Sequence, residues 1–217
     1  MNKKQAFLSI ALAAFLASCS DDSNSWNASE VCPESGRGTF VDERDGQVYK
    51  YTTIGNQVWM AENLNYNADY STCYDNDETN CEIFGRLYSL EMDGGNYGLL
   101  DNVMIDSICP QGWHIPSGND VKLLISEMGG NDSKTAQMMK STSLWDPSTG
   151  GAGSDECGFS AKPAGMRSGT VYESLYRTFH IWTSSMINTT LAQSLHIGMV
   201  VDTSFSFSQM SIRCIKD

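Results

Sequence analysis

Seven cysteines are the residues of this 217-residue chain whose chemistry is easiest to infer from type and spacing. Cys19 ends an apolar N-terminal run, and six others are spread along the rest of the chain: Cys32, Cys73, Cys81, Cys109, Cys157 and Cys214. An even set of cysteines in an exported chain is typical of disulfides, and six of them allow about fifteen pairings. The separation of Cys73 and Cys81 around a polar loop favours a local bridge. Zinc is the competing interpretation, but the chain has no C-x₂₋₄-C pair and its histidines are scattered.

Neither the histidines nor the acidic residues form a catalytic pattern. His114, His180 and His196 have no serine or cysteine nucleophile signature around them. Many acids are present, but no spacing singles out a pair for glycoside hydrolysis. The segment from Asp75 to Asn80 resembles a calcium loop, yet Asn80 and Arg86 occupy the positions where an EF-hand needs Gly and Glu. We therefore expect a protein that is not an enzyme and that holds no metal or cofactor.

Four residues in or near the long loops are candidates for contacting a ligand. Aromatic faces and acidic side chains are the groups that sugar binding would use, and the candidates are Trp145, Asp155, Glu156 and Tyr172. For each of them, ordinary packing or a solvated loop is the alternative. Trp59, Trp113 and Trp182 lie in strand patterns instead, and we expect them in the core.

The N-terminus carries a targeting segment over residues 1–18. Lys3 and Lys4 precede an apolar run, Ala6 to Ala17, that is too short to span a membrane comfortably. The sequence Leu16-Ala17-Ser18-Cys19 resembles a bacterial lipobox, which implies that Cys19 becomes a lipid-anchored N-terminus; a plain secretory signal is the alternative. The acidic residues that follow resemble the export signal of surface lipoproteins. We expect a lipid-anchored protein of the outer membrane or cell surface, with the membrane as a partner through its lipid.

Net charge limits the possible partners further. The formal charge is −12 and no basic patch is present, so nucleic acid is not an expected partner. Residues 19–37 are polar and aperiodic, and we expect a flexible tether there. Residues 38–217 then form one domain with one good core.

The elements that would position these residues alternate between strands and two helices. Residues 38–64 predict a β-meander with turns at Asp45-Gly46 and Gly55-Asn56. Cys109 to Ser117 predicts a short strand, after which Ser117 caps a helix that Gly129-Gly130 ends. Asp132 or Ser133 caps a second helix. Residues 85–90 are expected as a strand or the start of a short helix. Further strands are expected at residues 158–165, 170–172, 181–185, 192–200 and 211–215. This order predicts an α+β fold with two central helices and mostly antiparallel strands.

Several motifs, in order, resemble the Fibrobacter succinogenes major paralogous domain family. They are Asp45-Gly46-Gln47-Val48-Tyr49, the segment from Trp59 to Asn65, Cys81 through Tyr88, Cys109 to Ser117, Gly158-Phe159-Ser160-Ala161 with Pro163-Ala164-Gly165, Trp182 to Ser185, and Arg213-Cys214-Ile215-Lys216-Asp217. The resemblance covers residues 38–217 and implies an exported domain without an established activity. Parts of it are also similar to the C-type-lectin-like and formylglycine-generating-enzyme architecture, which would be a fold analogy only.

The resemblance also bears on the disulfides and the function. The lectin-like analogy implies a Cys109–Cys214 bridge. Cys157 stands where family members more often carry an apolar or aromatic residue, which makes a Cys32–Cys157 bridge possible. A non-catalytic adhesion domain that recognises glycan or plant-fibre polysaccharide is the expected function. The alternatives are a structural envelope component that binds another protein and, with less support, a formylglycine-type enzyme, which would need two neighbouring redox-active cysteines late in the chain.

Overall fold

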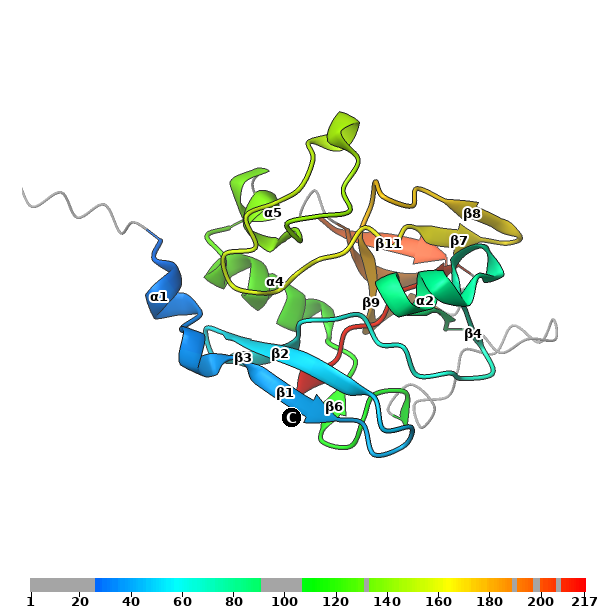
Figure 1. The fold of residues 1–217 in the computed structure, drawn as a ribbon, viewed down its shortest axis with the longest axis horizontal. Coiled ribbons are helices and arrows are strands. Elements are labelled where there is room, and N and C mark those ends of the chain that lie inside the picture. The colour runs from blue at the N-terminus through cyan, green and yellow to red at the C-terminus, as the bar shows by residue number, and fades with distance from the viewer. Residues whose placement is uncertain (1–25, 91–106, 131–132, 189–190, 197–199, 206–207) are drawn as a thin grey trace, which may run out of the picture.

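Three antiparallel sheets and four α-helices make up the described part of the chain (Figure 1). The structure is a computed structural model that describes residues 26–90, 107–130, 133–188, 191–196, 200–205 and 208–217. The predicted α+β class with mostly antiparallel strands is confirmed. The targeting segment and Cys19 lie outside the described residues, as does Asp132. No helix among the described residues is long and apolar enough to cross a membrane.

The predicted meander forms the first sheet. Strands β1 (Gly38–Val41), β2 (Val48–Ile54) and β3 (Gln57–Met60) are consecutive and antiparallel. Both predicted turns are present, and Gly46 and Gly55 supply the left-handed backbone (φ 76° and 57°) that they require. The sheet is completed by β13 (Ile215–Lys216), which lies between β3 and β6 (Trp113–His114). The last strand of the chain is therefore built into the first sheet.

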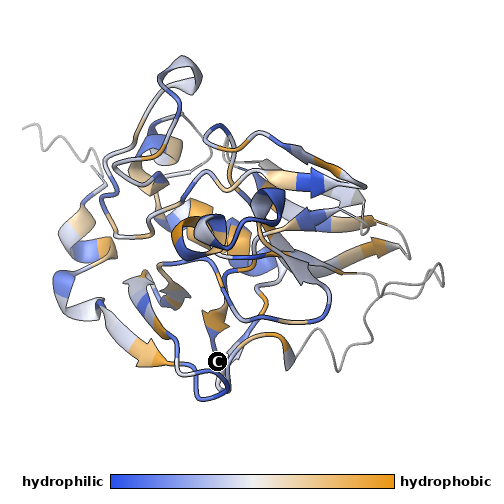
Figure 2. Ribbon diagram, turned by 45° about the vertical axis from the view of Figure 1, so that its right-hand side comes forward, coloured by the Kyte–Doolittle hydropathy of each residue, from blue (hydrophilic) through white to orange (hydrophobic). Residues whose placement is uncertain are grey.

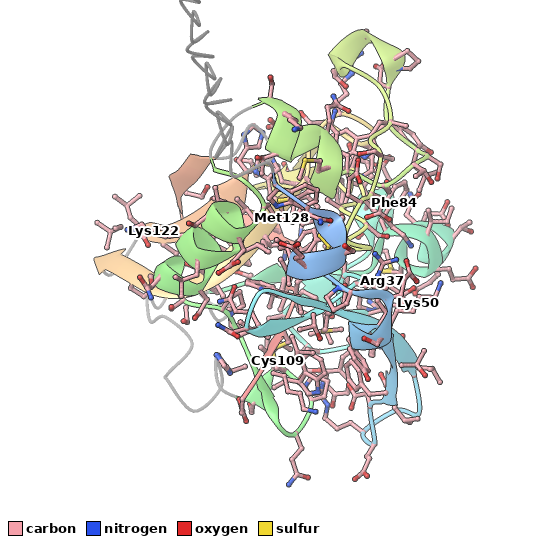
Figure 3. All side chains as sticks on the ribbon, turned by 90° about the vertical axis from the view of Figure 1, so that its left-hand side faces the viewer. Arg37, Lys50, Phe84, Cys109, Lys122 and Met128 are labelled. Carbon is pink, nitrogen blue, oxygen red and sulfur yellow. A yellow bond between two sulfur atoms is a disulfide. The ribbon has the colours of Figure 1, made fainter. Side chains whose placement is uncertain are left out.

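Two central helices follow β6, as the sequence predicts. Helix α4 (Gly118–Glu127) starts with a capping box, in which Ser117 accepts from the Asp120 backbone and the Asp120 side chain accepts from the Ser117 backbone. Along α4, Lys122 points into solvent, while Met128 at its end is fully buried (Figure 3). Helix α5 (Ser133–Met139) buries Met138 and Met139. Two further helices are α1 (Ala28–Val31) and α2 (Glu78–Phe84), and single turns lie at Glu34–Gly36, Tyr74–Asn76 and Pro147–Thr149.

The remaining strands form two smaller sheets. One has the order β11 (Val200–Phe205), β10 (Leu191–His196), β9 (His180–Asn188). The other has the order β4 (Ser71–Thr72), β5 (Leu87–Ser89), β12 (Gln209–Met210), β7 (Met166–Ser168), β8 (Val171–Glu173). The strand expected over residues 158–165 is absent: only Ala161 makes an isolated bridge, to Lys140. Pro163 lacks the N–H that a longer ladder would need there.

Two clusters of buried side chains lie on opposite faces of the first sheet. Trp59 joins one cluster with helix α4 and Phe159, and Trp113 joins the other with Trp182. The prediction that these three tryptophans belong to the core is confirmed, since each is at most 7% exposed. Hydrophobic residues, in orange, gather on the elements in the middle of the molecule (Figure 2).

Three disulfides join the six cysteines of the domain. The pairs are Cys73–Cys81, Cys109–Cys214 and Cys32–Cys157. The last of these corrects the expected boundary of the tether, because residues 26–37 pack onto the domain. Trp26 Nε1 donates to the Glu127 carbonyl at 2.7 Å, and Gly55 N donates to the Val31 carbonyl at 2.7 Å. Trp26 and Val31 are apolar and pack against the core. The mostly polar composition of the segment around them predicted a flexible tether instead.

Candidate functional site

The four predicted ligand-loop residues do not converge on one site. Trp145 is 6% exposed and belongs to the core. Its indole Nε1 donates to the Ala161 carbonyl at 3.1 Å, and Lys140 Nζ lies 4.1 Å from the ring centroid. The loop folds most of Trp145 inward, and the small part that reaches the surface lies beside Leu144 and Tyr176.

The other three candidates lie in separate places. Asp155 is half-buried and accepts from the Ser160 backbone at 2.7 Å and from the Ser160 hydroxyl. Burial raises the pKa of Asp155, and the hydrogen bonds from Ser160 oppose that rise. Glu156 is exposed beside it, and its carbonyl accepts from Arg37. Tyr172 is on strand β8, where its ring packs 5.0 Å from that of Tyr74. Asp155 and Tyr172 thus serve local structure.

A small polar pocket of about 140 Å³ is the strongest candidate site among the described residues. We call it the polar pocket, and its lining is Gln47, Val48, Tyr49, Glu62, Asn63, Asn65, Cys81, Glu82, Ile83, Gly85 and Lys162. These residues come from the start of β2, the segment after β3, the C-terminal half of α2 and the segment before β7. Three of the motifs on which the family resemblance rests contribute residues to this pocket. Lys162, which lies between the two parts of a fourth motif, also lines it.

Lys162 supplies a hydrogen-bond donor to the polar pocket. Its Nζ donates to the Ile83 carbonyl at 2.8 Å, which fixes one of the three N–H groups of the ammonium. Burial lowers the pKa of Lys162, the charge of Arg213 lowers it further, and the charge of Glu62 acts in the opposite direction. The ammonium therefore has further N–H groups that can donate to a ligand, and it lies in a partly desolvated environment.

Glu62 and Asn65 supply acceptors. One carboxylate oxygen of Glu62 accepts from the Lys50 backbone at 2.9 Å. Asn65 Oδ1 is buried and has no hydrogen-bond partner among the described residues. The Asn65 backbone is held in place, since its N–H donates to Tyr49 at 3.0 Å and its carbonyl accepts from Gln47 at 3.1 Å. A buried acceptor without a partner is costly unless something else, such as a ligand or water, satisfies it.

A buried arginine supports the floor of the polar pocket. Arg213 is fully buried; it donates to Asn63 Oδ1 at 2.8 Å, to the Ser160 carbonyl at 2.7 Å and to the Phe159 carbonyl. Burial lowers the pKa of Arg213 to about 9, while the charges of Asp155 and Glu62 raise it. Asn63 in turn donates to the Phe84 carbonyl at 2.8 Å. This network links the C-terminal segment to two of the segments that line the pocket.

The chemistry of the polar pocket is that of a binding site with both donors and acceptors. An ammonium and a carboxylate in one pocket complement a ligand that carries several hydroxyl groups. A lysine with a lowered pKa can also be a nucleophile, but Lys162 Nζ is already bonded to a backbone carbonyl. Reasoning from the sequence missed Glu62, Asn65 and Lys162; the one available signal was their place in or between the family motifs.

Other groups with possible chemistry have structural explanations. Cys73, Glu78 and Cys81 bring metal-ligating atoms together, but both sulfurs are bonded to one another, so no thiolate is available. His114 Nδ1 lies 2.7 Å from the carboxylate of Asp217 at the exposed end of β6. The His180 and His196 rings stack across β9 and β10 with centroids 4.5 Å apart.

Comparison with known proteins places the chain in one family. The model of the Fibrobacter succinogenes major domain matches residues 52–216, and the chain belongs to this family. The match includes Glu62, Asn65 and Lys162, whereas Gln47 to Tyr49 precede it. Neither a curated protein nor a solved structure matches the chain.

Proposed function

We propose that this protein is a lipid-anchored lipoprotein of the outer membrane or cell surface whose domain binds a glycan without modifying it. The observation that carries the proposal is the polar pocket, which Lys162 and Glu62 line together from distant parts of the chain. A sugar ring carries hydroxyls that donate and accept at once, so it can bond to both the ammonium and the carboxylate. Plant-fibre polysaccharide is the class of glycan that the family's bacterial setting suggests.

A charged macromolecule suits the polar pocket less well. Lys162 is offset by Glu62 and Glu82 in the lining, and the chain as a whole has a formal charge of −12. This balance disfavours phosphate-rich ligands, which basic clusters bind. An uncharged ligand with many hydroxyls remains the best complement.

The disulfides support a binding domain over a formylglycine-type enzyme. Such an enzyme needs two neighbouring reactive cysteines late in the chain, yet Cys157 and Cys214 are fully buried and belong to different disulfides. A C-type-lectin-like arrangement is part of the proposal. It is supported by the Cys109–Cys214 bridge and by the last strand pairing with β3 of the first sheet.

The test is glycan binding by the purified domain and by a pocket variant. We expect the wild type to be retained on cellulose or xylan, or on specific glycans of an array, with and without chelator. Lys162→Gln removes the ammonium and leaves a polar side chain that is one atom shorter. It should weaken binding by about tenfold or more, because hydrogen bonds to charged groups contribute about 1.5–3 kcal/mol. Lys122→Gln on the solvent face of α4 is the matched control and should bind like the wild type.

Two outcomes would contradict the proposal. If Lys162→Gln and the wild type bind equally well, the polar pocket is not the site. If the folded wild type is retained on no glycan and instead cross-links to one envelope protein on cells, the domain is a structural or protein-binding component. Urea unfolding of each variant checks that a loss of binding is not a loss of fold.

A further inference from the structure

A second surface lies beside the polar pocket and exposes an aromatic ring. We call it the Tyr176 surface; it is lined by Leu144, Trp145, Asp146, Leu175, Tyr176 and Arg177. Tyr176 is 45% exposed and Leu144 is 36% exposed, so an apolar patch stands open to solvent. Arg177 Nε donates to Asp146 Oδ2 at 3.1 Å beside this patch. The surface thus joins an aromatic face with a donor and an acceptor.

The backbone holds the Tyr176 ring in a fixed position. Asp146 N donates to the Tyr176 carbonyl at 2.7 Å, and Tyr176 N donates to the Pro163 carbonyl at 3.0 Å. Leu144 and Tyr176 both have left-handed backbones, with φ of 74° and 64°. Side chains other than glycine rarely adopt this conformation, and it persists only where surrounding structure imposes it. The loop therefore presents an exposed tyrosine that is already in place before a ligand arrives.

Two strips of chain connect the Tyr176 surface to the polar pocket. The Tyr176 ring meets the edge of the Phe84 ring, with centroids 5.6 Å apart. Phe84 lies between Ile83 and Gly85, and both of these line the polar pocket. On the other strip of chain, Pro163 bonds to Tyr176 while its neighbour Lys162 lines the polar pocket. One ligand of several units needs only to cross these two strips to reach both places.

We propose that the Tyr176 surface is a second sugar subsite, so that the natural ligand is an oligosaccharide or polysaccharide rather than a single sugar. This inference rests on the proposed function of the polar pocket. A sugar ring has an apolar C–H face that stacks on an aromatic ring and edge hydroxyls that need both donors and acceptors. Tyr176 supplies the first requirement, and the Asp146–Arg177 pair supplies the second. A fixed ring also loses little conformational entropy on binding.

The test measures how affinity depends on ligand length. Cello-oligosaccharides and xylo-oligosaccharides of one to six units are titrated into the wild type by calorimetry. In the series that binds, affinity should rise by roughly two- to tenfold once the chain is long enough to reach Tyr176, the effect expected of one aromatic contact. Tyr176→Ala should remove that rise and leave binding of the shortest ligand unchanged. Tyr176→Phe keeps the ring and should restore the rise, and Val171→Ala, another exposed apolar site, is the control.

The outcomes separate this inference from the proposed function. If the wild type binds no oligosaccharide of any length, both fail. If the shortest ligand binds and depends on Lys162, but Tyr176→Ala keeps the full length dependence, only the second subsite is overturned. A photo-crosslinker at residue 176 that captures one envelope protein on cells, with no length dependence in vitro, would likewise overturn the subsite in favour of a protein partner.

Discussion

Arg213 shows how one residue can organise several segments. The guanidinium is fully buried, lies 4.5 Å from the Phe159 ring centroid, and bonds to an amide oxygen and two backbone carbonyls. Removing Arg213 would leave those acceptors buried without a donor. Each would then cost its desolvation free energy, which exceeds the net contribution of a typical hydrogen bond. Because Arg213 bonds to both Asn63 and the segment around Ser160, the geometry of the polar pocket depends on a residue outside its lining.

Asp42 gives a pH-dependent prediction at the same scale. Burial alone would raise the pKa of Asp42, but hydrogen bonds and charge from Arg44 outweigh it and hold the pKa below the ordinary 3.8. Asp42 is fully buried, and its carboxylate lies 2.7 Å from Arg44 Nη2. Its folded pKa is depressed, so the stabilisation is complete above about pH 4 and is lost as pH falls through the folded value.

Asp42→Asn should therefore lower the free energy of unfolding by about 2 kcal/mol at pH 7. The difference from wild type should shrink well below pH 3.8, where wild-type Asp42 is also neutral. Urea unfolding at pH 7 and at successively lower pH measures this. Glu43→Gln removes a charge from the neighbouring exposed residue and should change stability by less than about 0.5 kcal/mol. A deficit of Asp42→Asn that is the same at every pH would show that the ion pair is not its cause.

Residue roles were predictable from the sequence only where the local pattern decides them. Trp59, Trp113 and Trp182 lie in short stretches that the sequence predicts as strands, and each is buried as expected. Trp145 lies in a polar stretch that suggests exposure, yet it is buried because the chain folds back over it. Glu62 and Lys162 are 100 residues apart, and only the tertiary fold brings them to one pocket.

Among the elements, those defined by local signals were predictable. The turns of the meander and the Ser117 capping box need only residues a few positions apart, and both are present. Short strands at the C-terminal end were less predictable. In the stretch from residue 211 to 215 only Ile215 belongs to a named strand, because the rest is buried by packing rather than by a ladder. Burial of a segment therefore produced a strand-like pattern without a strand.

The disulfides should differ in what they contribute to stability. Cys32–Cys157 closes a separation of 125 residues and Cys73–Cys81 one of 8. In the chain-entropy model these correspond to about 5 and about 2.5 kcal/mol. We expect the Cys32→Ser/Cys157→Ser double variant to lose about twice as much stability as Cys73→Ser/Cys81→Ser, measured by urea unfolding. Equal losses, or a larger loss for the short bridge, would show that native packing rather than loop closure dominates.

At the scale of the whole molecule, the proposed lipid anchor places the domain close to a membrane. Trp26, the first residue that the structure describes, is bonded to the domain and lies seven residues after Cys19. An extended chain spans at most about 3.6 Å per residue, so the anchor point and the domain are within roughly 25 Å of one another. The domain would therefore work near the membrane surface, with little freedom to explore more distant space.

Cys19→Ser tests the anchor directly. In cells that carry the full-length gene, we expect the wild-type protein in the membrane fraction and the variant in the soluble exported fraction, because the lipid on Cys19 would be the attachment. Metabolic labelling with a fatty acid should mark the wild type only. Ser20→Ala is the control for a change beside the cleavage point. Labelling of both proteins, or membrane attachment of both, would contradict the anchor.

The Cys32–Cys157 bridge also decides how the molecule bears mechanical load. Strand β1 is at the edge of its sheet, so a pull applied at residue 38 would separate it from β2 one hydrogen bond at a time. A pull from the membrane instead reaches Cys32 before it reaches β1, and it passes through a covalent bond to Cys157, which is fully buried in the core. If the domain holds a fibre while the cell drags against it, the force enters at the middle of the molecule and bypasses its weakest edge.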